Sequence, residues 1–164
     1  MSWFSKLLVM VLPACKTASQ ISYRHDPTAE LHKSWNLADP ALQPFTRDGV
    51  VISPRPVPLD YENTAIKLLF AAPSARSVAV GAATLQGAGG SRALSGDQTA
   101  AVDKAASSPG VYKGEVTLGT LTGVELETLS GGANLQLIVT FPDAPAAELR
   151  FELTRHTDTY VVSR

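Results

Sequence analysis

A glycine-rich segment is the first place where residue types and spacing suggest a binding chemistry. Gly87-Ala-Gly89-Gly90-Ser-Arg92 begins like the loop that holds the phosphates of a dinucleotide. Arg92 occupies the third glycine position, however, and no alternating strands and helices surround the segment, so a mobile surface loop is the simpler interpretation. Arg92, Gly89 and Gly90 remain a candidate anion-binding site, because guanidinium and backbone N–H groups both donate to anions.

Two groupings of serine and histidine residues invite comparison with hydrolase active sites. Ser130, in the segment 128–132, looks like a nucleophile elbow whose first glycine is replaced, but a strand rather than a helix is expected around it. His156 and Asp158 are two residues apart on an expected strand, hence ~7 Å apart along it, and Ser163 falls on the opposite face. We therefore assign no catalytic residue.

A cluster of metal-ligand residue types lies near the N-terminus. It consists of His25, Asp26, Glu30 and His32. In a helix over 26–33 the two histidines would be two turns apart, which is long for a shared ion, and no third ligand has a familiar spacing. A chance grouping is the stronger interpretation, and no metal site is assigned.

The single cysteine follows a short apolar run at the start of the chain. Lys6 precedes Leu7-Leu-Val-Met-Val-Leu12, which is far shorter than the ~20 residues of a membrane-spanning helix but suits a signal peptide. The block Leu12-Pro13-Ala14-Cys15 resembles the lipobox of bacterial lipoproteins. That resemblance implies cleavage between Ala14 and Cys15 and a diacylglycerol on the Cys15 thiol.

The resemblance to bacterial lipoproteins also implies a cellular location. Two or more acyl chains hold a protein stably at a membrane, so the anchor would be the covalent lipid on Cys15, with no other cofactor. Lys16 stands where lipoproteins retained at an inner membrane often carry Asp, which favours an outer membrane facing the periplasm. Cleavage would remove Lys6 and no acid, leaving a mature chain with formal charge −2. Attachment would therefore depend on acyl chains rather than on attraction to anionic lipid.

Length and composition limit the remaining possibilities. The 164 residues suit one domain, and 45% hydrophobic against 18% charged residues argues against wholesale disorder. Lys and Arg number 14 against 15 Asp and Glu, so no basic surface for nucleic acid is expected. One Cys excludes an internal disulfide framework.

The region 15–60 is predicted to be a lipid-anchored, Pro-rich tether after a signal peptide at 1–14. Residues 16–60 hold six of the eleven prolines, and 54–58 is expected to form polyproline II. Three features are expected to fold within this tether. Trp35 and Phe45 pack on the head, 49–52 forms a short strand, and 26–33 forms one or two helical turns with Asp26 as cap.

From residue 61 the hydrophobic pattern changes to a period of two, which predicts strands with one buried face. The expected strands include 66–70, 78–80, 115–118, 124–128, 135–141, 149–153 and 159–162. Turn residues between them favour antiparallel neighbours. The segment 86–109 is too small and polar for a strand, and a short helix near 96–106 is expected. Residues 61–164 are therefore predicted to form a mostly β, antiparallel β-sandwich of about 6–8 strands.

The sequence thus favours a membrane-anchored cell-envelope lipoprotein that is not an enzyme and acts as a structural or protein-interaction module. Its expected partners are the membrane and an envelope protein, without nucleic acid and without an assigned small-molecule substrate. One alternative is an exported small-ligand binder or hydrolase that uses the 86–98 loop or the His156 region. Another is an uncleaved cytoplasmic or virion structural component with residues 3–12 buried in a subunit contact.

Overall fold

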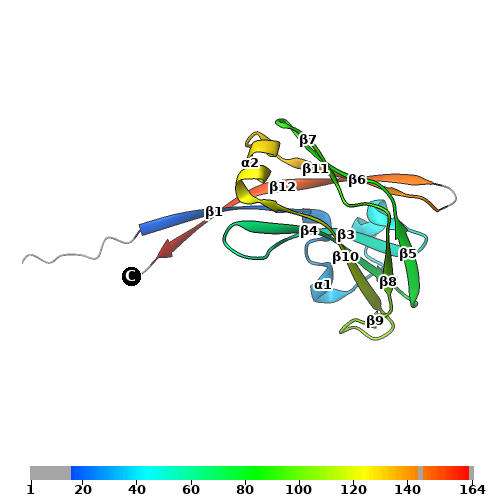
Figure 1. Ribbon diagram of the computed structural model, residues 1–164. Helices are drawn as coiled ribbons and strands as arrows, with labels where there is room; N and C mark the ends of the chain where they lie inside the picture. The colour runs from blue at the N-terminus through cyan, green and yellow to red at the C-terminus, as the bar shows by residue number, and fades with distance from the viewer. Residues whose placement is uncertain (1–15, 144–145, 163–164) are drawn as a thin grey trace, which may run out of the picture.

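The structure, a computed structural model, describes residues 16–143 and 146–162. The chain is mostly β and its sheets are antiparallel, as the sequence predicts. Two five-stranded sheets lie one above the other (Figure 1). The first has the order β1-β12-β11-β6-β7, made of β1 (Lys16–Arg24), β12 (Ala147–Val162), β11 (Leu135–Phe141), β6 (Ala83–Gly87) and β7 (Gly90–Leu94).

The second sheet has the order β2-β3-β4-β10-β9. Its strands are β2 (Thr46–Arg47), β3 (Val50–Pro58), β4 (Asn63–Ala72), β10 (Tyr112–Thr122) and β9 (Lys104–Ala105). A separate pair joins β5 (Arg76–Val80) to β8 (Gln98–Val102). The helical elements are short: η1 (Asp26–Thr28), α1 (Leu31–Ser34), η2 (Pro40–Phe45) and α2 (Gly123–Ser130).

The main hydrophobic core lies between the two large sheets. Residues of β11 alternate between buried and half-buried positions, and Leu137 and Val139 are fully buried against residues such as Leu68 and Phe70 of β4. Burial of each such side chain contributes roughly 1.5–3 kcal/mol. The period-two patterns of the sequence therefore correspond to this inner layer.

The region 16–60, predicted to be a Pro-rich tether partly packed on the head, contributes strands to both large sheets. β1 pairs with β12 over nine residues, and β3 pairs with β4 from Val51 to Pro58 where polyproline II was expected. Trp35 is buried with Leu31 and Leu42 against the outer face of β3 and β4, and Phe45 packs on the main core, as predicted. Asp26 begins η1 without capping it, since the cap residue is His25.

Two further predictions are wrong. Strands β6 to β9 occupy most of the region 86–109, so no helix forms near 96–106. Conversely, the strand expected at 124–128 is helix α2. The Thr122 hydroxyl accepts from the Glu125 N–H while the Glu125 carboxylate accepts from the Thr122 N–H, which is a capping box, and Gly131 ends the helix in the left-handed conformation.

Candidate functional site: the cleft beside the β1–β12 ribbon

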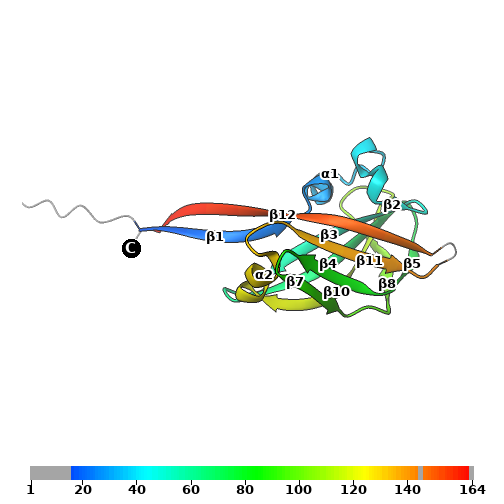
Figure 2. The ribbon, with the colours of Figure 1, turned by 90° about the horizontal axis from the view of Figure 1, so that it is seen from above.

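A two-stranded ribbon extends from one end of the body. It consists of β1 paired with residues 154–162 of β12, whereas residues 147–153 of β12 pair with β11. Figures 1 and 2 show the ribbon leaving the body in both views. Lys16, the residue after the predicted lipidated cysteine, begins β1 at the outer end of the ribbon. Ala14 and Cys15 themselves lie outside the described residues.

The base of the ribbon is joined to α2 by a polar cluster of four side chains. Arg155 on β12 donates to both oxygens of the Glu127 carboxylate, with Nη2–Oε2 at 2.9 Å and Nε–Oε1 at 3.2 Å. The Tyr23 hydroxyl of β1 donates to the same carboxylate and lies 2.8 Å from the Ser130 hydroxyl. A bidentate guanidinium fixes both distance and orientation, so this cluster sets the angle at which the ribbon leaves the body.

Electrostatics keep the Glu127 carboxylate charged. The hydrogen bonds from Arg155 lower the pKa of Glu127 below its ordinary value, against the opposing effect of desolvation. Burial raises the pKa of Tyr23, and its hydrogen bond to Glu127 raises it further. The tyrosine is therefore a neutral donor and the glutamate a charged acceptor at neutral pH, which suits a positioning contact.

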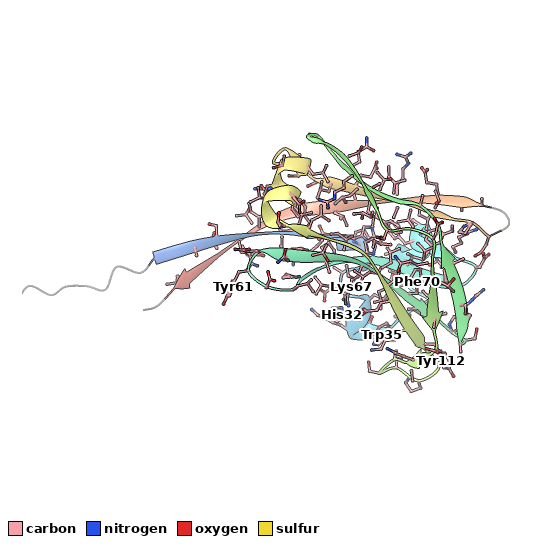
Figure 3. The ribbon with its side chains drawn as sticks, in the orientation of Figure 1. His32, Trp35, Tyr61, Lys67, Phe70 and Tyr112 are labelled. Carbon is pink, nitrogen blue, oxygen red and sulfur yellow. The ribbon has the colours of Figure 1, made fainter. Side chains whose placement is uncertain are left out.

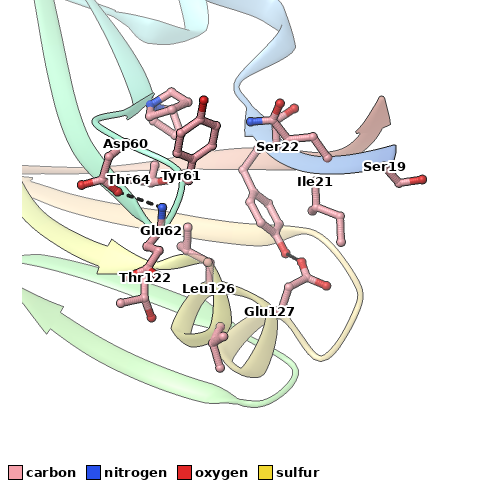
Figure 4. A pocket seen from close by; sticks show the side chains of 16 residues that line it. Ser19, Ile21, Ser22, Asp60, Tyr61, Glu62, Thr64, Thr122, Leu126 and Glu127 are labelled. Carbon is pink, nitrogen blue, oxygen red and sulfur yellow. Dashed lines mark hydrogen bonds between the residues drawn. The ribbon is translucent and has the colours of Figure 1, made fainter. Parts of the chain in front are cut away.

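A cleft of about 650 Å³ lies between the ribbon, the β3–β4 turn and α2 (Figure 4). Ile21 points from β1 toward α2 in this view, and Tyr61 lies across from it. The cleft is lined by Ser19, Gln20, Ile21, Ser22, Tyr23, Pro56, Pro58, Asp60, Tyr61, Glu62, Thr64, Thr122, Gly123, Val124, Leu126 and Glu127. Its volume is within the range of sites that bind other molecules.

Exposed apolar side chains gather at this end of the molecule. Among the described residues, the large hydrophobic side chains that remain exposed are Ile21, Leu59, Tyr61, Val124 and Val161. Three of them line the cleft, and Leu59 adjoins its Pro58 and Asp60 walls. Tyr61 is fully exposed on the ribbon side of the body (Figure 3). A gathered apolar surface of this kind is typical of an interaction site.

The cleft is also acidic. Its lining includes the carboxylates of Asp60, Glu62 and Glu127 and no lysine or arginine. The side chain of Asn63 and the backbone N–H groups of Glu62 and Asn63 donate to Asp60 and lower its pKa, so Asp60 carries its charge at neutral pH. Since Arg155 neutralises Glu127, the remaining negative charge lies on the β3–β4 turn.

Two groups of the candidate anion site have partners within the protein. The Arg92 guanidinium donates to Glu125 at 2.6 Å, and the Gly89 N–H donates to the Leu129 carbonyl at 2.9 Å. A Cβ on Gly89 would lie 1.9 Å from the Thr128 carbonyl oxygen, so the glycine serves the contact with α2. Gly90 begins β7 with a positive φ.

The hydrolase candidates lie apart from one another. His156 Nε2 is 3.0 Å from the Asp26 carboxylate, and Asp158 accepts from the Ser22 hydroxyl at 3.5 Å. Ser163 lies outside the described residues. Ser130 is buried at the end of α2, where its hydroxyl donates to the Glu127 carbonyl. Neither His156 nor the 86–98 segment lines the cleft.

The four residues of metal-ligand type near the N-terminus also lie apart from one another. His25 is buried against Phe45 and Phe151, Asp26 contacts His156, Glu30 pairs with Lys33, and His32 contacts Arg55. Within residues 16–143 and 146–162, no group of three metal-ligating side chains is present.

The residues that shape the cleft were missed by sequence reasoning. Tyr23 and Glu127 are 104 positions apart, and no local motif marks such a pair. One signal was available for α2, because Thr122 and Glu125 have capping-box spacing before Leu126 and Leu129.

Comparisons with known proteins give no family. No protein-family model, curated protein or solved structure matches the chain. Among the described residues, no helix has the length and apolar character needed to cross a membrane.

Proposed function

We propose that this protein is a lipid-anchored component of a bacterial cell envelope whose β-sheet body is a structural or protein-interaction module. The observation that carries the proposal is the order of features at the start of the chain. An apolar run ends in Leu12-Pro13-Ala14-Cys15, and strand β1 begins at the next residue, Lys16. A signal peptidase acting before Cys15 would therefore remove no residue of the ribbon.

The ribbon supports this proposal with a mechanical role. Eight residue steps from Lys16 to Arg24 span about 26 Å at ~3.3 Å per residue. Paired strands are stiffer than the Pro-rich tether that the sequence suggested, because each residue of β1 lies opposite a residue of β12 in an antiparallel pair. A lipid on Cys15 would thus hold the body at a defined distance from the bilayer, with the cleft on the membrane side of the body.

The proposed location of the module is the outer membrane, on the side that faces the periplasm. Lys16 supports it through the lipoprotein resemblance, since retention at the inner membrane is associated with Asp at that position. The body then acts through its surface. The covalent lipid is the one non-protein group that we propose.

Metabolic labelling tests the anchor. Bacteria producing the full chain are grown with labelled palmitate, and the wild type is compared with Cys15→Ser. We expect label on the wild type and none on the variant, because Cys15 is the sole thiol.

A matched control carries Cys15→Ser together with Ser19→Cys, which restores a thiol four residues outside the motif. This double variant should stay unlabelled. Equal labelling of all three proteins, or an unlabelled wild type that retains Met1, would refute the anchor.

A further inference from the structure

In the part of the chain that the structure describes, no strand pairs with the outer edge of β1. The Arg155 N–H donates to the Asn134 side chain on the β11 side of β12, so it points away from β1. In an antiparallel pair, the residue opposite then also points its N–H and C=O away from its partner strand. Tyr23 is opposite Arg155, and the alternation extends to Ile21 and Ser19. These three residues present their backbone groups outward along the cleft.

Another edge beside the cleft is blocked by prolines. The Leu59 N–H donates to the Asn63 carbonyl, which shows that odd-numbered residues of β3 bond to β4. The even-numbered residues therefore face outward, and Pro54, Pro56 and Pro58 remove every donor along that stretch. This edge offers carbonyl oxygens but cannot support a full antiparallel ladder.

Three other sheet edges are short or covered. Strands β2 and β9 have two residues each. β7 is beside α2, and Arg92 of β7 is bound to Glu125 of α2. The opposite edge of the ribbon, on β12, is unpaired from Thr157 outward but contributes no residue to the cleft. Proteins usually protect exposed edges by these means, whereas β1, which lies near β3 without pairing with it, combines an unpaired edge with an apolar cleft.

We infer that β1 and the cleft bind an extended peptide segment of a partner protein by strand addition. The segment adds beside β1, bonding to the backbone of Ser19, Ile21 and Tyr23, and places alternate apolar side chains in the cleft. A Lys or Arg of the segment reaches toward Asp60 and Glu62. This inference names the partner class for the proposed interaction role and does not depend on the lipid anchor.

Charge and side-chain chemistry favour a foreign segment over a second copy. In a pairing of two β1 strands, residues 18–23 of the second copy would bring no Lys or Arg toward Asp60 and Glu62. Its Tyr23 would also be held by its own Glu127, leaving Ile21 as the free large apolar side chain on that face. A segment with apolar residues at alternate positions and one basic residue complements the site better.

The test uses a displayed library of random nine-residue segments selected against the full chain in detergent. We expect enriched segments to alternate apolar residues, to contain Lys or Arg, and to lack proline at alternate positions. Binding of synthetic versions is then measured for the wild type, Ile21→Pro, Ile21→Val and Thr157→Pro. Thr157 is directly opposite Ile21 and its N–H points to the other edge, so the two proline variants are matched.

Ile21→Pro should weaken binding by about tenfold or more, since it removes an edge donor and blocks close approach. Ile21→Val and Thr157→Pro should bind within about twofold of the wild type. Glu62→Gln should weaken binding of basic segments several-fold, and more so at low salt. Thermal unfolding verifies that each variant is folded.

Any of the following outcomes would overturn the inference: no enriched alternating segment, equal loss in the two matched proline variants, or a full chain that self-associates through an edge sensitive to Ile21→Pro. Vesicle binding by the Cys15→Ser protein that Ile21→Pro abolishes would instead assign the edge to lipid and would also overturn it. Palmitate labelling is independent of these results, so failure here leaves the anchor proposal standing.

Discussion

The two halves of β12 belong to one continuous strand but have opposite surroundings. Residues 147–153 pair with β11, and Phe151 and Leu153 are fully buried in the main core. Residues 154–162 pair only with β1, and the described side chains there are half-buried or exposed. The first half is held by packing, whereas the second is held by backbone pairing and the Arg155–Glu127–Tyr23 contacts.

The two halves of β12 therefore depend on different interactions for their stability. Two-stranded ribbons are at best marginally stable in water by themselves, so the ribbon depends on the contacts at its base. The body has a conventional sheet core and gains its stability from burial. Substitutions should therefore affect global unfolding in the first half and local opening in the second.

Phe151→Ala should give the largest effect. Phe151 stacks on Phe45 with ring centroids 5.8 Å apart, and its removal leaves a cavity that costs about 3–5 kcal/mol. Thr159→Ala, on the exposed half of the same strand, should change the free energy of unfolding by less than about 0.5 kcal/mol. Urea denaturation measures both. Similar values for the two variants would erase the contrast between the halves of β12.

Acid should weaken the body through His25, the residue directly after the end of β1. Burial lowers the pKa of His25 to about 4, although the neighbouring Asp26 carboxylate opposes this shift. Between about pH 6.5 and 4 the unfolded chain binds a proton that the folded chain does not, so stability falls as the pH falls. The loss reaches about 2–3 kcal/mol at most.

Urea denaturation at pH 7, 6, 5 and 4.5 checks this, with His25→Gln as the comparison. The variant should lose most of the decline above pH 4.5, because carboxylates such as Glu127, whose pKa is lowered, act at more acidic pH. An unchanged pH dependence in His25→Gln would show that another group is responsible.

Glu127→Gln should loosen the ribbon more than the body. The substitution removes the half-buried carboxylate charge that pairs with Arg155, and it should lower the stability of the ribbon by about 1–2 kcal/mol. Amide hydrogen exchange should accelerate at even-numbered β1 residues, which bond to β12, while β11 amides stay protected. Glu148→Gln, which breaks the exposed Arg150 pair, serves as the control and should change little. Uniform acceleration throughout the protein would contradict a local role.

Thr122→Ala should have the smallest of these effects. It removes the side-chain half of the α2 capping box and should cost about 1 kcal/mol. Because α2 forms one wall of the cleft and carries Glu127, exchange should also increase modestly at the base of β1. Thr120→Ala, on β10 two residues earlier, is a suitable comparison and should leave α2 exchange unchanged.

The inner strands could be predicted from sequence because their environment imposes a period of two. The failure at α2 has a specific cause: apolar residues at 124 and 126 satisfy a strand pattern, but the buried residues Leu126, Leu129 and Ser130 have helical spacing. The capping-box residues and Gly131 indicate the two ends of this helix more reliably than the apolar pattern does.

The polyproline II prediction over 54–58 failed for a different reason. Pro54, Pro56 and Pro58 argue against a central strand, but an edge strand accepts proline wherever the N–H would face outward. Sequence alone does not reveal which strand will be an edge. The cleft was likewise beyond prediction, because it depends on Ile21, Tyr61 and Val124 meeting from three distant segments.

The most direct test of the central claim is the intact mass of the protein purified from bacterial membranes. The account predicts a chain that begins at Cys15 and carries the added mass of a diacylglycerol, usually with a further acyl group on the new amino terminus. An unmodified chain that begins at Met1 would contradict it.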